Sequence, residues 1–425
     1  MARNLAEWLD WQSRVHPLAM DFTLDRIRAV LDRLPIRRPS GPVFVVGGTN
    51  GKGSVAALLS ALMAADGRRV GCYTSPHLVR YQERIVIDGQ EINDRVLVDV
   101  FERVEAARGA TTLTFFEYAT AAAALAFSDA NLDSWVLEVG LGGRLDAVNA
   151  IDGDCAIVVS VGLDHTELLG PDIESIAREK AGVFRAGRPA ILGQRFLPRS
   201  LAEVAAHLPC PLEQLGRDYQ VDVGDQRFSW RRGKERLDDL PAPALPGAVQ
   251  FDNAGTALTA LAATNTLPNR AAVETGLSRV ELRGRFERRT TPGGIEWILD
   301  VAHNPPAAAA LAANLAAMPA SGRTLAVIGM LADKDAAGVG RELAPQLDGW
   351  VAVTLTGDRG LTHEALAQRL EASLGPPIAS VDTVAQGLAL ARAKVTTGDR
   401  VVALGSFHTV GPALEWLRLY SGAPR

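Results

Sequence analysis

The chain is poor in cysteine, in net positive charge and in long apolar runs. Cys72, Cys155 and Cys210 are scattered and odd in number, which fits neither a disulfide framework nor a C-x-x-C metal site and predicts a reducing cytoplasm. The net charge of −5 gives no basic footprint for nucleic acid or an anionic membrane. No window approaches about 18 uninterrupted apolar residues, and residues 1–17 have no continuous hydrophobic core, so we expect neither a membrane span nor a signal peptide.

The remaining composition is that of an ordinary α/β enzyme. Hydrophobic residues make up 47% of the chain, charged residues 22% and aromatic residues 6%, which excludes disordered and fibrous classes. At 425 residues, a prior of about 150 residues per domain predicts two or three domains. Because the net charge is negative, a small anionic substrate must be bound by local positive charges at a site.

Apolar, β-rich runs alternate with helical patterns, which predicts parallel sheets with helices on both faces. In the first part the expected strands are 43–46, 69–73, 134–139, 156–161 and 189–192, and the expected helices include 24–34, 175–181 and 251–263, the last capped by Asp252 or Asn253. In the second part the expected strands are 296–300, 324–328, 350–355 and 401–404, with an alanine-rich helix at 307–317.

Two stretches interrupt this alternation. Residues 217–239 carry mixed charges and predict a small antiparallel excursion. Residues 283–294 are charged and then rich in glycine, and are the natural domain boundary. We divide the chain into domains 1–288 and 289–425. Both would be α/β, the first a P-loop ATPase domain with a parallel sheet and the second a smaller Rossmann-like domain, with ligands expected at the carboxyl ends of the strands in a cleft between the two.

The strongest single motif is Gly47-Gly48-Thr49-Asn50-Gly51-Lys52-Gly53-Ser54, between an apolar run and a helical pattern. A strand that turns through glycines into a helix aims N–H groups and a lysine at an anion, which predicts a phosphate site. Gly53 breaks the usual G-x-x-x-x-G-K-[ST] string. From Gly51 to Ala56 the residues also fit the dinucleotide fingerprint, but residues 71–75 lack the acid that holds the ribose. A turn that serves only chain geometry stays open, and mononucleotide binding is favoured.

Two polar residues near other strand ends are candidate metal ligands. Glu138 closes an apolar strand, where an acid is costly unless it is paired or metal-bound, and a nucleotide site needs a carboxylate for Mg²⁺. An edge-strand acid facing solvent is the alternative for Glu138. His165 follows the next apolar run, and its alternative is a structural hydrogen-bonding histidine. Lys180 lies in a helical pattern, and its local sequence alone does not indicate a function.

The second part repeats a polar loop after a strand. Asp300-Val301-Ala302-His303-Asn304-Pro305 and Gly405-Ser406-Phe407-His408-Thr409 suggest a polar second-substrate site, although helix capping would explain each loop alone. Arg285, at the domain boundary, is either a phosphate contact or a solvated arginine.

In combination these motifs resemble those of the folylpolyglutamate synthases of the Mur ligase superfamily, especially the bacterial bifunctional dihydrofolate synthase/folylpolyglutamate synthases. The resemblance covers nearly the whole chain, and the inserted Gly53 is the family's own form of the loop. The matching strings are Gly48-Thr49-Asn50-Gly51-Lys52-Gly53-Ser54, Thr74-Ser75-Pro76-His77-Leu78, Glu138-Val139-Gly140-Leu141-Gly142-Gly143-Arg144, Leu163-Asp164-His165-Thr166, Glu179-Lys180-Ala181-Gly182, Asp300-Val301-Ala302-His303-Asn304-Pro305 and Gly405-Ser406-Phe407-His408-Thr409-Val410.

The resemblance implies an ATP-dependent ligase in which a substrate carboxylate attacks the γ-phosphate and L-glutamate captures the acyl phosphate. It implies an ATP-binding domain with a pterin site at 1–288 and a glutamate-ligase domain at 289–425. It also implies two Mg²⁺ ions, a K⁺ ion and a Lys180 carbamylated by CO₂. The implied catalytic residues are Lys52, His165, Lys180, Asp300 and His303. The implied ATP-binding residues are Gly48, Thr49, Asn50, Gly51, Lys52, Gly53, Ser54, Asn253, Arg285 and Asp300. The implied metal ligands are Ser75, Glu138 and His165, and the implied substrate contacts are Phe116, Asp146 and Ala147 for the pterin with His303 and Ser406 for glutamate.

Three alternatives remain at this point. A monofunctional folylpolyglutamate synthase would lack the dihydropteroate activity. A peptidoglycan Mur ligase shares the reaction, but only about forty residues precede the phosphate loop here, too few for its uridine-nucleotide domain. A P-loop switch would bind nucleotide without making bonds, and Ala332-Asp333-Lys334-Asp335 is not the base-reading motif of a guanine switch. Residues 21–27 depart from the Gly-Leu-x-Arg form expected there. We expect a cytoplasmic monomer whose partners are dihydropteroate, reduced folates, L-glutamate and ATP, with no nucleic acid and no membrane.

Overall fold

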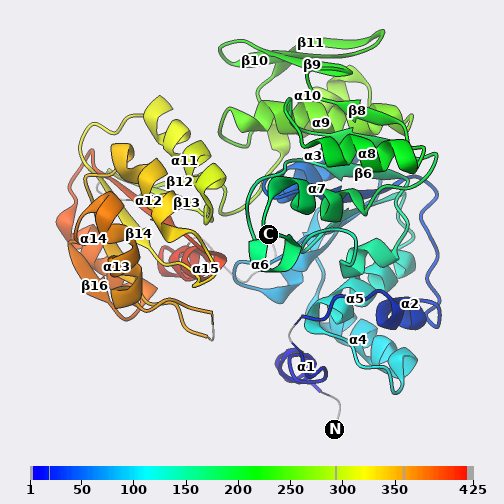
Figure 1. Cartoon of the computed structure of the whole chain (residues 1–425), viewed down its shortest axis with the longest axis horizontal. Helices are drawn as coiled ribbons and strands as arrows, with labels where there is room; N and C mark the ends of the chain where they lie inside the picture. Colours follow the sequence, from blue (N-terminus) through cyan, green and yellow to red (C-terminus); the bar gives the residue numbers. More distant parts are fainter. Residues whose placement is uncertain (1–2, 19, 292–293, 358, 419–425) are drawn as a thin grey trace. The chain divides into compact units, whose positions relative to one another are not determined.

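The computed structural model describes residues 3–18, 20–291, 294–357 and 359–418. They form two units (Figure 1). Of the described residues, the first unit contains those within 1–77, 81–244 and 251–281, and the second contains those within 78–80, 245–250 and 282–425. The chain thus passes finally into the second unit at Leu282, a few residues before the expected division at 288.

The first unit is built on an eight-stranded sheet of order β4-β3-β2-β5-β1-β6-β7-β8. All neighbours are parallel except the pairs β2–β3 and β3–β4. The strands are β1 (Val43–Gly47), β2 (Val70–Tyr73), β3 (Ile85–Ile87), β4 (Gln90–Glu91), β5 (Ser134–Glu138), β6 (Cys155–Val158), β7 (Ala190–Leu192) and β8 (Leu212–Gln214).

Helices cover both faces of this sheet, as the uninterrupted burial of β1 requires. Alternate residues of a strand point to opposite faces: Val43 and Val45 join the core beneath α4 and α5, while α3 contacts β1, β2 and β5 and packs on α10. The helices are α1 (Leu5–Gln12), α2 (Asp25–Leu31), α3 (Lys52–Ala65), α4 (Asp94–Arg108), α5 (Phe115–Asp129), α6 (Thr166–Leu169), α7 (Ile173–Ala181), α8 (Arg199–His207), α9 (Val249–Ala263) and α10 (Arg270–Arg279), with 3₁₀ turns η1 (Tyr81–Arg84) and η2 (Ala147–Ala150).

The expected antiparallel excursion is confirmed as a separate three-stranded sheet of order β11-β10-β9. Its strands are β9 (Tyr219–Val223), β10 (Arg227–Arg232) and β11 (Glu235–Pro241). One detail of the next helix was predicted wrongly. Because α9 begins at Val249, Asp252 lies in its first turn, and Asn253 lies inside the helix rather than at its N-cap.

The second unit is a six-stranded sheet of order β12-β13-β17-β14-β15-β16. Only β12 is antiparallel to its neighbour, so part of the stretch expected to be a boundary loop is an edge strand; Pro292 and Gly293 lie outside the described residues. The strands are β12 (Glu287–Thr291), β13 (Ile295–Asp300), β14 (Thr324–Ile328), β15 (Gly349–Val353), β16 (Ala379–Val381) and β17 (Arg400–Leu404), and the helices are α11 (Pro305–Ala317), α12 (Ala336–Leu343), η3 (Ala344–Gln346), α13 (His363–Leu374), α14 (Val384–Lys394) and α15 (Phe407–Trp416).

The second sheet also has a core on each face. Side chains such as Ile298 and Ile328 pack with α11, α12 and α13, whereas their strand neighbours Leu299 and Val327 pack with α14 and α15. Both units are therefore α/β layers with helices on two sides, which confirms the expected fold class of a P-loop domain and a smaller Rossmann-like domain.

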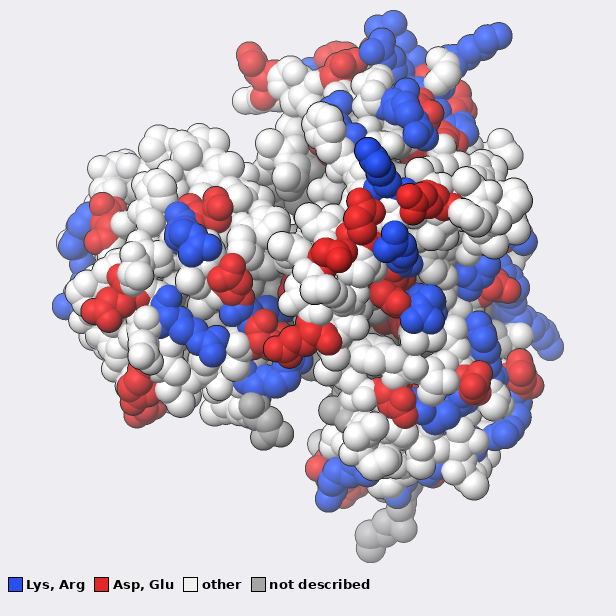
Figure 2. Space-filling model, in the orientation of Figure 1, with Lys and Arg blue, Asp and Glu red and all other residues white. Residues whose placement is uncertain are grey.

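The surface agrees with a sequence in which acidic and basic residues are nearly equal in number. Acidic and basic side chains alternate over the face shown in Figure 2, with no patch of one sign dominating it. Within the described residues, no helix is both long and apolar enough to cross a membrane.

Candidate active site

The phosphate loop lies at the carboxyl end of β1, near the middle of the first sheet. Gly51, directly before α3, has a left-handed φ of 83°. A Cβ on Gly51 would lie 2.7 Å from Val159 Cγ1, so both backbone conformation and space require glycine there. Lys52, Gly53 and Ser54 are the first three residues of α3, where N–H groups have no partner within the helix. Lys52 Nζ curls back to donate to the carbonyls of Gly48 (3.1 Å) and Thr49 (3.3 Å).

The segment after β6 holds this loop in place. Thr49 N donates to Ser160 O (2.8 Å), and Ser160 Oγ bonds both the N–H and the carbonyl of Asn50 (2.8 Å each). Gly162 N donates to Thr49 Oγ1 (3.0 Å). The sequence analysis did not single out Ser160, although a polar residue at the end of an apolar run was an available signal. Because β6 ends at Val158, the end of this strand was predicted three residues too late.

Asn253 approaches the loop from α9, some 200 residues further along the chain. A Cβ on Gly51 would lie 3.2 Å from Asn253 Oδ1, so this amide borders the phosphate loop.

Glu138 ends β5, which lies between β2 and β1. Its side chain is 5% exposed, which rules out an edge-strand acid facing solvent. Glu138 Oε2 accepts the N–H of Ser75 (3.1 Å), in the loop after β2, where the Ser75–Pro76 bond is cis. The structure therefore brings two of the three candidate metal ligands together beside the phosphate loop.

His165 is the third candidate metal ligand. It has a left-handed φ of 51° and precedes α6, and its Nε2 lies 3.8 Å from Asp164 Oδ1 with the histidine side chain 26% exposed. Among the described residues, no three His, Cys, Asp or Glu side chains gather closely enough to form a metal site by themselves. The candidate ligands Ser75, Glu138 and His165 fit Mg²⁺, which commonly takes one or two protein oxygens and completes its shell with water and phosphate.

Lys180 is buried in α7, with 3% of its surface exposed. Burial, and then repulsion from Lys52, lowers its pKa to about 7, against the opposing attraction of Asp164 and Asp146. Burial raises the pKa of Asp146 to about 7 as well, although N–H groups and Lys52 favour its charged form. Four titratable side chains therefore interact electrostatically beside the phosphate loop: Lys52, Asp146, Asp164 and Lys180. Shifts in pKa of this kind are typical of functional sites.

The candidate pterin residues lie in the same region. Asp146 accepts the N–H of Leu141 (2.8 Å) on one oxygen and that of Val148 (3.0 Å) on the other, so it orders its own loop and keeps further lone pairs. The Phe116 ring covers Gly140, where a Cβ would lie 2.6 Å from the ring. Phe116 and Ala147 pack in one apolar cluster.

In the second unit, Asp300 ends β13 and pairs in register with Leu404 of β17, which places the loops of His303 and Ser406 side by side. Asp300 accepts the N–H groups of Phe286 (2.7 Å) and Ala302 (2.8 Å). Burial raises its pKa, and the nearby Arg285 opposes this.

Three polar residues around Asp300 have defined contacts. The Arg285 guanidinium lies 5.1 Å from the centre of the Phe407 ring. His303 Nδ1 donates to Val301 O (2.8 Å), which fixes the tautomer. Ser406 caps α15 by accepting the N–H of His408 (3.1 Å) and is 5% exposed. Capping thus accounts for part of this loop, as considered above.

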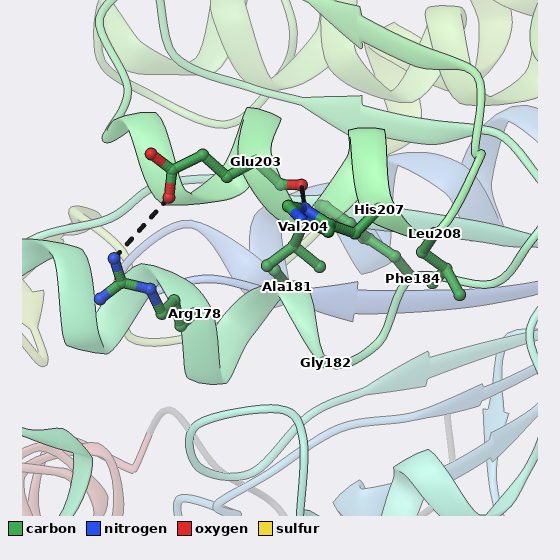
Figure 3. A pocket seen from close by; sticks show the side chains of 8 residues that line it. All are labelled: Arg178, Ala181, Gly182, Phe184, Glu203, Val204, His207 and Leu208. Carbon is green, nitrogen blue, oxygen red and sulfur yellow. Dashed lines mark hydrogen bonds and ion pairs between the residues drawn. The ribbon is translucent and has the colours of Figure 1, made fainter.

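A surface depression of about 430 Å³ lies between α7 and α8, away from these groups (Figure 3). Arg178 and Glu203 face each other across its rim at 3.7 Å, over an apolar floor that includes Phe184 and Val204. Arg178 and Ala181 share one face of α7, and the 100° step per residue puts Lys180 on the opposite face. The depression contains none of the candidate site residues.

Comparison with known proteins identifies the family to which the chain belongs. Residues 284–407 match the Mur ligase glutamate ligase domain. Dihydrofolate synthase/folylpolyglutamate synthase of Escherichia coli K12 is 42% identical over 414 residues, covering 97% of this chain and 96% of that protein. The chain belongs to the dihydrofolate synthase/folylpolyglutamate synthase family.

Solved structures agree with this family. E. coli FolC in complex with DHPP and ADP has a TM-score of 0.93 at 42% identity, covering 98% of both chains. A bifunctional folylpolyglutamate synthase/dihydrofolate synthase with Mn, AMPPNP and L-glutamate bound has a TM-score of 0.90 at 40% identity, with the same coverage. The predicted family is thus confirmed, and with it an ATP-dependent ligase of the Mur ligase type rather than a nucleotide switch.

Proposed function

We propose that the protein joins L-glutamate to 7,8-dihydropteroate, forming dihydrofolate, and also adds glutamate to reduced folates. In both reactions the acceptor carboxylate oxygen attacks the γ-phosphorus of ATP, and the bond to the β–γ bridging oxygen breaks as ADP leaves. The glutamate nitrogen then attacks the acyl carbon, a proton is lost, and phosphate departs from the tetrahedral intermediate. The two steps are needed because a carboxylate is a poor electrophile until its oxygen becomes part of a leaving group.

The observation that carries this proposal is the position of the Phe116 ring over Gly140, two residues after Glu138, which pairs in register with Val46 just before the phosphate loop. It joins the candidate acceptor group of Phe116, Asp146 and Ala147 to the candidate nucleotide group. A carboxylate held by the first group would lie near a phosphate held by the second, as direct transfer between them requires.

Each group has a role that suits its chemistry. The N–H groups at the start of α3 and the Lys52 ammonium would stabilise charge on the moving phosphoryl group. Asn253 would contact the nucleotide beside the loop, and Arg285 and Asp300 would do so from the second unit. His303 and Ser406 would hold the incoming glutamate.

Ser75 and Glu138 would hold one Mg²⁺ and His165 a second, beside the phosphates. Bound there, Mg²⁺ would neutralise phosphate charge during transfer. The structure of a family member with Mn and AMPPNP bound supports a divalent ion at this place.

The proposal is tested by measuring phosphate release with different acceptors. We expect ATP hydrolysis that requires both L-glutamate and a pteroate or folate. Dependence on a uridine-linked muramyl substrate would instead show a peptidoglycan ligase, and slow GTP turnover without any acceptor would show a switch.

Asp146→Ala should damage dihydrofolate synthesis more than folate extension, because an aspartate can accept two hydrogen bonds from the aminopyrimidine face of the pterin. A hydrogen bond to a charged group contributes about 1.5–3 kcal/mol, so we expect a loss of roughly 10- to 100-fold in kcat/KM for dihydropteroate. Asp146→Asn keeps an acceptor oxygen for one of the two loop N–H groups. Equal losses for both acceptors in both variants would show that Asp146 only orders its loop.

Lys180 should be carbamylated by CO₂. The neutral amine would attack CO₂ and lose a proton, giving an anionic carbamate among positive groups such as Lys52. Because the pKa of Lys180 is lowered to about 7, the amine is mostly protonated below about pH 6 and neutral above about pH 8. At fixed ¹³CO₂ pressure, a carbamate ¹³C NMR signal should therefore grow between these values.

The signal should disappear in Lys180→Met and persist in Lys234→Ala, since Lys234 is an exposed lysine in the turn between β10 and β11. Electron density for an unmodified Lys180 ammonium, in crystals given bicarbonate and Mg-ATP, would contradict carbamylation.

We further propose that the protein works as a monomer in the cytoplasm and that K⁺ supports the reaction. Sedimentation equilibrium tests the first point. Replacement of K⁺ by Na⁺ in the phosphate-release measurement tests the second.

A further inference from the structure

A chain of charged side chains ties the segment before α2 to the beginning of α5. His16 Nε2 lies 3.3 Å from Asp21 Oδ2. Arg26 bonds the same carboxylate through Nη1 (2.5 Å), and its Nη2 lies 3.2 Å from Glu117. The side chains of Arg26 and Glu117 are 18% and 4% exposed. Arg26 therefore bridges two acids from distant parts of the chain, in the region where the sequence departs from the family form.

Glu117 is also the residue that organises the first turn of α5. Its carboxylate accepts the N–H of Thr114 (2.8 Å), and its own N–H donates to Thr114 Oγ1 (3.2 Å). This is a capping box, which fixes where the helix starts. Phe116 is the second residue of the same turn. Arg26 therefore binds the end of the helix that carries the Phe116 ring, the candidate for stacking on the pterin.

The segment held by Arg26 also packs on the candidate acceptor residues. Leu24 and Ile27 flank it and are buried with Ala147 in one cluster, against which Phe116 packs. Phe116, which also covers Gly140, thus has apolar neighbours from the N-terminal segment. A shift of this segment relative to α5 would move the apolar side chains that pack against Phe116 and Ala147.

Stability alone does not explain the charges. A buried ion pair commonly contributes no more than apolar side chains of the same volume, while one partner left alone is costly. What such a pair can do is favour one arrangement over its neighbours, because every alternative leaves a buried charge without its partner.

We propose that Arg26 is a positioning residue for the acceptor substrate. By holding Asp21 and Glu117 together, it fixes the register of residues 21–27 against α5 and so sets the position of Phe116 and Ala147. The inference rests on the proposed function, because it assumes that these two residues contact the acceptor.

The test compares KM values for 7,8-dihydropteroate, ATP and L-glutamate in matched variants. Glu117→Gln removes the charge but keeps the capping box, in which glutamine replaces glutamate. Arg26→Met removes the cation. Should it alone fail to fold, the double variant Arg26→Met/Glu117→Gln leaves no charge at position 117, while Asp21, 32% exposed, keeps His16 beside it. Arg103→Met is the control, because Arg103 pairs with Asp129 (3.2 Å) at the opposite end of α5.

We expect the KM for dihydropteroate to rise roughly tenfold in Glu117→Gln and in the double variant, since small misplacement of binding groups has effects of this size. The KM values for ATP and L-glutamate should stay within about twofold, and Arg26→Lys should restore part of the loss because it keeps one ion pair. Arg103→Met should behave as the wild type.

Unchanged KM for dihydropteroate in both Glu117→Gln and the double variant would overturn the inference. So would a parallel rise of all three KM values, which would show a structural role only. A wild-type protein that uses no pteroate or folate acceptor would instead overturn the proposed function, and the inference with it.

Discussion

Lys52→Ala should lower kcat for both ligations by about 10³-fold, the upper range for loss of one group that stabilises transition-state charge. Lys52 begins α3 and folds back over the phosphate loop, so in the proposed site its ammonium would lie where negative charge moves between the β- and γ-phosphates. A group that acts mainly in the transition state affects kcat more than KM for ATP.

The measurement is steady-state kinetics with both acceptors, together with thermal unfolding. Lys234→Ala, which removes an exposed lysine, is the matched control and should keep wild-type rates. A folded Lys52→Ala protein that retains most of its kcat would refute the phosphate role of this loop.

Glu138→Ala and Glu138→Gln should both raise the Mg²⁺ concentration needed for half-maximal activity, by at least about tenfold. Glu138 is buried beside Ser75, and a hard cation binds a carboxylate far better than an amide. His165→Ala should raise the requirement as well, as the loss of a ligand to a second ion.

The glutamine variant separates charge from structure, because its amide oxygen can still accept the N–H of Ser75. If Glu138 only held that loop, Glu138→Gln would titrate like the wild type while Glu138→Ala would not. Unchanged Mg²⁺ curves for Glu138→Gln and His165→Ala would show that both residues are structural.

Local patterns were enough to predict the scaffold of the site. The phosphate loop needs glycines at defined turns, and Gly51 has the left-handed φ and the crowded surroundings that demand one. Fully buried parallel strands read as continuous apolar runs, so β1, β5 and β14 were predicted to within one residue. The carboxyl ends of β5 and of β13, which was also predicted to within one residue, then pointed to Glu138 and Asp300.

Short elements and exact boundaries were harder. The β3–β4 hairpin was missed although its turn, Asp88-Gly89, has positive φ at both residues and is a known hairpin signal. Edge strand β12 was hidden because its charged sequence reads as a loop. The start of α9 was placed two residues late because Asp252 and Asn253 suit an N-cap as well as a first turn.

Groups defined by distant partners could not be found from local patterns, and Lys180 entered the predicted site only through the family resemblance. Lys180 reads as an ordinary helical lysine until the fold buries it near Lys52 and Asp146. Arg26 and Glu117 are 91 residues apart, and neither has a local pattern that indicates an ion pair. Burial and pairing of this kind depend on the packing of whole helices, which periodicity predicts only in outline.

The central claim is that one active site makes dihydrofolate and also extends folates. Its most direct test is mass analysis of the products that the purified protein forms from L-glutamate and Mg-ATP with either 7,8-dihydropteroate or a reduced folate. We predict dihydrofolate from the first acceptor and a folate one glutamate longer from the second, with both products lost in Lys52→Ala. Folate extension without any dihydrofolate, at high dihydropteroate concentration, would contradict the claim and show a monofunctional folylpolyglutamate synthase.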